Sequence, residues 1–261
     1  MTAVRWWLSD AWVVTLRHLR RIPRQPEMII FGIVQPILFI VLFRYLFGGA
    51  LAGAKGLGAG GYAQFLLPGV FVQTVVFGAV AAAAIGTAED MQKGLMDRFR
   101  SLPMSRSSVL LGRTFSDTVR NSLTVAVMIA VGFLVGFRFL GSPLEAVAGV
   151  ALLLLFGFSL SWIAVLIGLS VGSVEAAQGA GMIWLFPLTF ASSAFVPPET
   201  MPGWLRAFVE VNPVTVTVNT LRALFGGTPA GSAGWQMAAW MAGLIAVFLP
   251  LSVLKFRRTS A

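Results

Sequence analysis

Long blocks of apolar residues are the feature that most limits what this chain can fold into. A helix needs about 20 mostly apolar residues to cross a bilayer, and six segments of the chain meet that length. The six segments cover residues 27–47, 63–87, 115–137, 144–170, 178–197 and 233–254. The sequence therefore predicts an all-α polytopic membrane protein, with six transmembrane helices in a single domain over residues 1–261.

Charged residues are too few for this chain to cover itself with a water-facing surface. They make up 11% of its 261 residues, whereas a soluble domain carries about 25%. The chain has no cysteine and a single histidine, His18. This excludes a disulfide framework, a zinc–thiolate site and a multi-histidine metal site. We therefore expect no catalytic group, no metal and no cofactor held by this chain.

The distribution of basic residues predicts the orientation. Fourteen of the 19 lysines and arginines precede the first apolar segment, lie between the second segment and the start of the third (with Arg120 just inside it), or follow the last. Loops rich in Lys and Arg stay on the cytoplasmic side. We therefore expect both termini to be cytoplasmic, in the cytoplasmic (inner) membrane of a bacterium. The net charge of +9 then reflects topology and contact with anionic lipid rather than binding of nucleic acid.

Residues 3–21 carry too many charges to cross the membrane. One helical stripe of this segment is mostly apolar and the opposite side is largely basic, which is typical of a helix that lies on a membrane surface. Pro23 and Pro26 end the helix and turn the chain into the first span. The sequence thus predicts an interfacial elbow helix on the cytoplasmic leaflet.

The connection between the second and third spans is longer than two spans require. Leu95, Phe99 and Leu102 lie at i, i+4 and i+7 and predict a short helix with one apolar edge, which Pro103 ends. Such a helix across the mouth of a bundle suits the docking of a cytoplasmic partner. The alternative is a solvated basic loop that only sets the topology.

The stretch 198–225 is too apolar for a free loop and too interrupted for a span. Pro202 is expected to begin one short helix and Asn212-Pro213 a second. Two short broken helices at the outer face could form a gate, or they could rest on lipid headgroups. The candidate outer-gate residues are Pro198, Met201, Pro202, Trp204, Phe208, Asn212 and Pro213.

These two regions carry a family resemblance. The run from Glu89 through Gly94-Leu95-Met96-Asp97-Arg98-Phe99-Arg100-Ser101-Leu102-Pro103-Met104-Ser105 resembles the cytoplasmic signature of ABC-2 type permeases. The later run Pro198-Glu199-Thr200-Met201-Pro202-Gly203-Trp204, followed by Asn212-Pro213-Val214-Thr215 and Arg222, resembles the outer signature of that family. Both lie in the expected order, and within the family the chain is most similar to the daunorubicin-resistance type of permease.

The resemblance implies an architecture and a set of partners. It implies six spans, a cytoplasmic elbow helix, a coupling helix over 95–102, and two re-entrant outer helices before the last span. It also implies that two such subunits, identical or different, pair with two ATPase subunits that bind ATP and Mg. The residues expected to contact the ATPase are Glu89, Asp90, Gly94, Leu95, Asp97, Arg98, Phe99, Arg100 and Leu102.

The chain itself lacks a phosphate-binding loop. That loop needs Gly-Lys followed by Ser or Thr, but Lys55 lies between Ala54 and Gly56, and neither Lys93 nor Lys255 fits. We therefore expect a transport subunit that is not itself an enzyme. Competing classes are an ion-coupled secondary transporter, an intramembrane enzyme and an assembly subunit without a transport path.

Few polar residues mark a substrate path. The candidates within the predicted spans are Gln35, Gln73, Thr74, Thr189, Ser192 and Ser193. Most such residues serve helix packing or bond back to a carbonyl. Largely apolar walls suit export of an amphipathic or hydrophobic molecule, such as a drug, lipid or natural product. A polysaccharide or lipid-linked glycan is the alternative substrate class.

Overall fold

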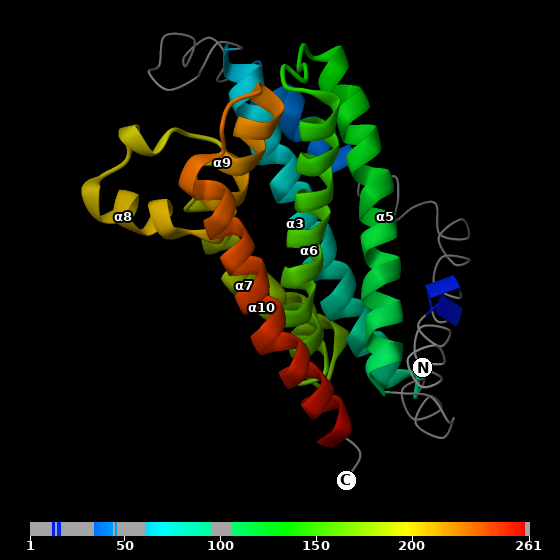
Figure 1. The fold of residues 1–261 in the computed structure, drawn as a ribbon. Helices are drawn as coiled ribbons and strands as arrows, with labels where there is room; N and C mark the ends of the chain where they lie inside the picture. The colour runs from blue at the N-terminus through cyan, green and yellow to red at the C-terminus, as the bar shows by residue number, and fades with distance from the viewer. Residues whose placement is uncertain are drawn as a thin grey trace.

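The computed structural model describes residues 12–13, 15–16, 34–43, 45, 61–94 and 106–258, and its elements in these ranges are helices without strands (Figure 1). The all-α prediction is confirmed for this part of the chain. The elements are α3 Gly61–Gln92, α5 Arg106–Leu134, α6 Pro143–Gly168, α7 Val174–Phe190, the 3-10 helix η2 Pro198–Thr200, α8 Gly203–Val211, α9 Pro213–Gly226 and α10 Gly231–Arg258.

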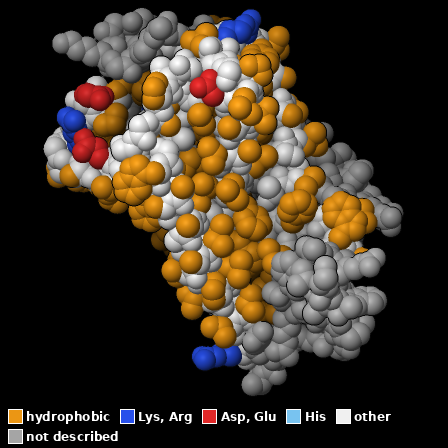
Figure 2. Space-filling model, viewed as in Figure 1, with side chains coloured by type: hydrophobic (Ala, Val, Ile, Leu, Met, Phe, Trp, Pro, Cys, Tyr) orange, Lys and Arg blue, Asp and Glu red, His pale blue; other side chains and the backbone are white. Residues whose placement is uncertain are grey.

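Four of these helices are long and apolar enough to cross a membrane. They are α3, the Leu110–Leu134 part of α5, α6, and the Gly231–Phe256 part of α10. Figure 2 shows hydrophobic side chains along the length of the viewed face, with Lys, Arg, Asp and Glu near its two ends and on the projection at its upper left. That distribution is the one expected of a bundle set in a bilayer.

Two of the six predicted spans contain shorter helices. A described apolar helix, Val34–Phe43, lies in the predicted first span, and α7 in the predicted fifth span has 17 residues. The six-span layout therefore stays a prediction. Helix α5 contains most of the predicted third span, 115–137, and begins before it at Arg106. Helix α7 ends at Phe190 rather than near 197.

The predicted elbow and coupling helices fall mostly or wholly outside the described residues. Of the elbow segment the structure describes Trp12, Val13, Thr15 and Leu16, which are helical. The Thr15 hydroxyl donates to the carbonyl oxygen of Gly112 at 2.9 Å, so this part of the segment lies against α5. Residues 95–102 are not among those that the structure describes.

Helix α3 is the centre of the bundle. In its most apolar window 72% of the residues are buried inside the protein, compared with 50% for α6 and 22% for each of α5 and α10. A helix that is apolar on all sides belongs inside. Figure 1 shows α5 and α10 on the flanks of α3 and α6.

Local caps fix where the helices beside α3 begin. Ser142 and Glu145 form a capping box at the start of α6: the Ser142 backbone N–H donates to Glu145 Oε2 at 2.6 Å, and the Glu145 N–H donates to Ser142 Oγ at 3.3 Å. The Ser173 hydroxyl accepts from the Ala176 N–H at the start of α7. Free backbone donors are thus satisfied at both helix starts.

Glycines on α6 let it approach α3 closely. A Cβ built on Gly157 would lie 2.5 Å from Val75 Cγ1, and one built on Gly168 would lie 2.6 Å from the carbonyl oxygen of Ala84. Inside a membrane, helices associate mainly by such close packing, because lipid is as apolar as the helix surfaces. At Gly168 the neighbouring atom belongs to the backbone of α3 and cannot rotate away.

We expect Gly168→Ala to lower the free energy of unfolding by about 1–3 kcal/mol, because an added methyl group in a packed core forces the helices apart. The midpoint of thermal unfolding in detergent measures this. Gly243→Ala in α10 is the matched control, since a Cβ there meets open space. An equal response of the two variants would show that the α3–α6 contact does not limit stability.

Candidate functional site

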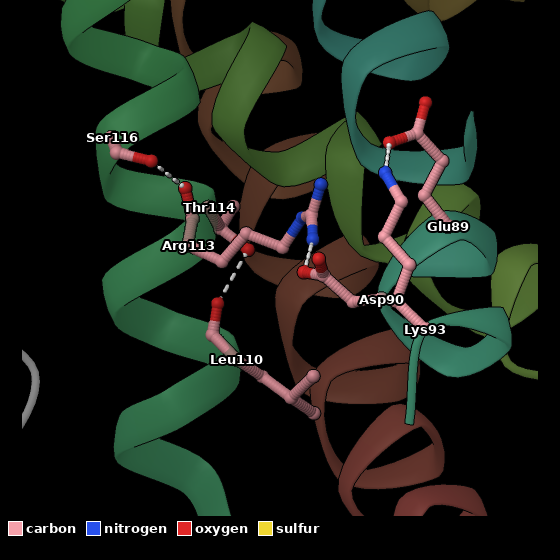
Figure 3. Close-up of polar contacts among 7 residues, drawn as sticks. All are labelled: Glu89, Asp90, Lys93, Leu110, Arg113, Thr114 and Ser116. Atoms are coloured by element: carbon pink, nitrogen blue, oxygen red, sulfur yellow. Dashed lines mark hydrogen bonds and ion pairs between the residues drawn. The ribbon is translucent and has the colours of Figure 1, made fainter. Parts of the chain in front are cut away.

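A buried ion pair joins the end of α3 to α5. Arg113 Nη1 donates to Asp90 Oδ2, and the two residues are 8% and 4% exposed. Figure 3 shows the Arg113 side chain reaching from its own helix toward the Asp90 carboxylate. The contact therefore connects two helices across a sequence separation of 23 residues.

The backbone of α3 leaves room for this arginine. A Cβ built on Gly86 would overlap the Arg113 guanidinium, so glycine one turn before Asp90 lets the side chain lie across the helix. The neighbouring hydroxyls on α5 are satisfied locally: Thr114 Oγ1 donates to the Leu110 carbonyl at 2.9 Å, and Ser116 Oγ donates to the Arg113 carbonyl at 2.7 Å. The group on α3 that pairs with Arg113 is thus the charged carboxylate of Asp90, not a hydroxyl.

A second, exposed pair lies beside the first. Lys93 Nζ donates to Glu89 Oε2 at 2.7 Å within α3, and the two side chains are 53% and 35% exposed. Exposed pairs of this kind contribute little because water screens them. Figure 3 shows both pairs at the same end of α3.

The opposite end of the bundle is organised by Arg222 on α9. Its Nε donates to the carbonyl oxygen of Phe65 at 3.0 Å, and the guanidinium carbon lies 3.5 Å from the centre of the Phe65 ring. The remaining four donor contacts are Nη1 to Ser193 Oγ and Asn219 Oδ1, and Nη2 to the carbonyl oxygens of Ser193 and Ala194. A guanidinium has five N–H donors, so all of them are engaged.

The charge of Arg222 is retained in this setting. Partial burial lowers the pKa of its guanidinium to about 9, which leaves it protonated at neutral pH. The cation then faces carbonyl oxygens and an aromatic ring, both of which are favourable partners for a desolvated positive charge. Arg222 thereby fixes α9 to the start of α3 and to the turn after α7.

Asn212 adds a second link between α7 and α9. Its Oδ1 accepts from the Val214 N–H at 2.8 Å and so caps α9, while its Nδ2 donates to the carbonyls of Leu188 and Ala191, each at 2.7 Å. One amide therefore satisfies groups at the end of one helix and at the start of another. The residue is 2% exposed, so water does not compete for these bonds.

Comparison with known proteins identifies the fold family. The family described as "ABC-2 type transporter" matches residues 9–225. This chain belongs to the ABC-2 type transporter family. The family predicted from the two motif regions is thus confirmed.

Relatives of this ABC-2 chain include drug-resistance permeases. It is 38% identical to the daunorubicin resistance ABC transporter permease protein DrrB1 of Streptomyces coeruleorubidus, over 100% of this chain and 89% of the relative. It is 26% identical to the probable doxorubicin resistance ABC transporter permease protein DrrC of Mycobacterium tuberculosis, over 99% and 92%. A putative transport permease, ycf38 of Cyanophora paradoxa, is 26% identical over 84% and 74%.

The predicted coupling residues divide between described and undescribed parts of the chain. Glu89, Asp90 and Gly94 lie at the end of α3 and in the turn after it. The others, namely Leu95, Asp97, Arg98, Phe99, Arg100 and Leu102, lie outside the described residues. Sequence reasoning did not pair Asp90 with Arg113. The available signal was Arg113 itself, a charged residue just before a predicted span.

The predicted outer-gate residues also divide, between α8 and α9. Asn212 and Pro213 are buried at the start of α9, whose apolar residues Val214, Val218 and Leu221 are each 0% exposed. Trp204 and Phe208 lie on α8 and are exposed. The remaining three, Pro198, Met201 and Pro202, lie in η2 and in the link to α8.

The predicted path residues are mostly buried within this single chain. Gln35 lies on an open apolar surface of the Val34–Phe43 helix, beside the exposed Val34 and Leu38. Thr74 Oγ1 donates to the Val70 carbonyl at 2.8 Å. Gln73, Thr189, Ser192 and Ser193 are buried. Gln73 Oε1 and Thr189 Oγ1 lack a hydrogen-bond partner among the described residues.

In the described ranges no group of three or more His, Asp or Glu side chains could hold a metal ion. The two sites described above are built from ion pairs and hydrogen bonds between helices. Both connect the central helix α3 to its neighbours, one at each end.

We expect Asp90→Asn to cost about 3–5 kcal/mol of unfolding free energy, because it removes the negative charge that faces a buried cation. Glu89→Gln, in the exposed pair, should cost less than about 1 kcal/mol. Replacing both buried partners, as in Asp90→Leu with Arg113→Leu, should cost less than Asp90→Asn alone. Denaturation of the three variants in detergent checks this order of losses in unfolding free energy. Equal losses for Asp90→Asn and Glu89→Gln would contradict the presence of a buried ion pair at Asp90.

Arg222→Lys should lower the unfolding free energy by about 2–3 kcal/mol, the scale of a lost hydrogen bond to a charged group. Lysine keeps the charge but has three donors and no planar fork. The matched control is Arg206→Lys on α8, where the side chain is half-exposed and bonds to Glu210. If both lysine variants unfold at the same midpoint, charge alone explains the role of Arg222.

Proposed function

We propose that this chain is the membrane-spanning permease subunit of an ATP-driven exporter, which moves an amphipathic or hydrophobic molecule out across the cytoplasmic membrane. The observation that carries the proposal is similarity over the full chain to a permease of daunorubicin resistance. A second drug-resistance permease is similar over almost the same length. Apolar helices with few polar residues are consistent with a drug, lipid or natural product as the substrate.

The proposed assembly contains two permease subunits, identical or different, and two ATPase subunits. ATP and Mg would bind to the ATPase subunits, since this chain has no phosphate-loop lysine. Both termini of the permease would lie in the cytoplasm, as the excess of basic residues on one side predicts. The six predicted spans, the elbow helix and the re-entrant outer helices complete the proposed architecture.

Coupling to the ATPase would act through residues 95–102, directly after α3. Their expected contacts with the ATPase include Glu89, Asp90 and Gly94 at the end of that helix. Because Asp90 is paired with Arg113, a displacement that reaches the end of α3 is passed to α5 as well. The pair would make the two helices move together when the ATPase subunits close.

The outer gate would be formed around α9 and the turn after α7. Asn212 and Pro213 fit this role best, because both are buried where α7, α9 and the turn meet. The predicted gate residues that come earlier, including Pro198, Met201 and Pro202, connect this region to α8. Opening would require the outer ends of these helices to separate from a neighbouring subunit or from each other.

Two unpartnered polar atoms support a path between α3 and α7. Phe77 packs edge-on against Phe186, and Gly69 approaches Ala194, so the two helices run antiparallel with Gln73 and Thr189 at similar depth. Each has a buried oxygen without a partner in the described structure. A polar group of a substrate would satisfy these atoms if the helices part. Gln35, Thr74, Ser192 and Ser193 remain further candidates.

Transport itself can be tested in inside-out vesicles that contain this permease and its ATPase. We expect ATP to drive accumulation of a fluorescent anthracycline, and a proton uncoupler to leave it unchanged. Accumulation that needs an ion gradient and not ATP would instead identify a secondary transporter.

The docking segment can be tested by co-purification. Phe99→Ala and Leu102→Ala should leave the permease in the membrane but weaken its hold on the ATPase. An aromatic anchor in a pocket often contributes over about 2 kcal/mol, which is roughly 30-fold in affinity. Phe208→Ala, at the other end of the bundle, is the matched control. Unchanged co-purification of both test variants would exclude 95–102 as the docking helix.

A further inference from the structure

Helix α8 presents an apolar face that no described part of the protein covers. Trp204 is 77% exposed, Val211 is 63% exposed and Phe208 is 48% exposed. Val209 on the same helix is fully buried, so the helix is fixed to the protein by a different side. Nine of the fourteen residues of its neighbour α9 are buried.

Seven of the nine residues of α8 define three faces. At about 100° per residue, Trp204, Phe208 and Val211 fall on one side. Arg206 and Glu210 fall on the side roughly opposite, where Arg206 Nε donates to Glu210 Oε1 at 2.7 Å. Leu205 and the buried Val209 lie between these two sides.

This arrangement of apolar and charged faces is the one expected of a helix that lies along a membrane surface. Such a helix needs one face for the acyl chains, an opposite face for water, and little net hydrophobicity. Among the described residues, the helix is buried along one edge, at Val209. No described residue covers its apolar face or its charged face, and the two faces point in different directions.

The position of α8 on the bundle agrees with that arrangement. Figure 1 shows α8 projecting sideways from the bundle, in the half where α9 lies. Figure 2 shows charged side chains toward the upper edge of this projection and hydrophobic ones along its lower edge, next to the hydrophobic surface of the bundle. The apolar face of α8 is thus continuous with the belt that the spanning helices present to lipid. Tryptophan is also enriched where hydrocarbon meets the headgroups.

We propose that α8 is a membrane-surface anchor, with Trp204, Phe208 and Val211 inserted among phospholipid acyl chains and the Arg206–Glu210 pair facing water. The partner is the bilayer that surrounds the bundle. The anchor holds α8 at the membrane boundary while α9, next to it, stays fixed in the protein. This proposal does not depend on ATP-driven export, and its test uses no ATPase.

The chain has no cysteine, so single-cysteine variants can be made without changing any other residue. Val211→Cys and Glu210→Cys form a matched pair of sequence neighbours on different faces, about 100° apart, and Phe208→Cys and Arg206→Cys form a second pair on roughly opposite faces. Each full-length variant would carry a nitroxide label and be reconstituted in nanodiscs of phosphatidylethanolamine and phosphatidylglycerol. Paramagnetic relaxation by oxygen reports contact with lipid, and relaxation by a water-soluble nickel chelate reports contact with water.

We expect oxygen to relax the labels at 208 and 211 more than nickel does, and the ratio to reverse at 206 and 210. Nickel dominance at all four positions would place α8 in water and overturn the proposal. Labels at 208 and 211 that neither reagent reaches would show that protein covers this face, either a second copy or another part of the same chain. That outcome would also overturn it. An unchanged unfolding midpoint for each variant confirms that the labelled protein is folded.

Discussion

The close contact between α3 and α6 is the constraint on which the other packing depends. It brings two apolar helices within reach of each other's backbone at Gly168 and Ala84, in an environment where the hydrophobic effect does not draw helices together. Once these two are joined, α5, α7, α9 and α10 have a surface to pack against. The polar contacts then occur at the edges of this apolar centre, at Asp90 on one end and near Phe65 on the other.

Buried Arg113 and partly buried Arg222 illustrate two ways to keep a charge inside a membrane protein. Arg113 is neutralised by a carboxylate on the next helix, which balances the charge but requires Asp90 to be present. Arg222 is stabilised mainly by carbonyl oxygens, hydroxyl and amide groups and an aromatic face. The second arrangement depends on the shape of the turn after α7, because the carbonyls of Ser193 and Ala194 must point toward the guanidinium.

The sequence predicted those parts of the fold that local chemistry decides. The predicted segment 144–170 matches α6, Pro143–Gly168, because apolar length and the Ser142–Glu145 cap are both visible in the sequence. Helix α5 begins at Arg106, before the predicted span 115–137, because the apolar length that defines a span does not mark the more polar turns with which the helix begins. The end of α7 was missed because Asn212 and Arg222 hold the turn after it, across more than 20 residues of sequence. For the sites, the motifs indicated the right regions, and Pro202 and Asn212-Pro213 marked where α8 and α9 begin. The pairing of Asp90 with Arg113, and the exposure of α8 beside the more buried α9, depend on tertiary contacts.

Two contacts hold α3, one near each end, and they allow this helix to act as a lever. Arg222 holds it near Phe65 and Arg113 holds it at Asp90, and 25 residues of helix separate these points by about 37 Å at 1.5 Å per residue. With the Phe65 end as the fulcrum, a tilt of about 5° would carry the Asp90 end sideways by about 3 Å. Conversely, a displacement of a few ångströms applied beside Asp90 would reach the fulcrum as a small rotation with little translation.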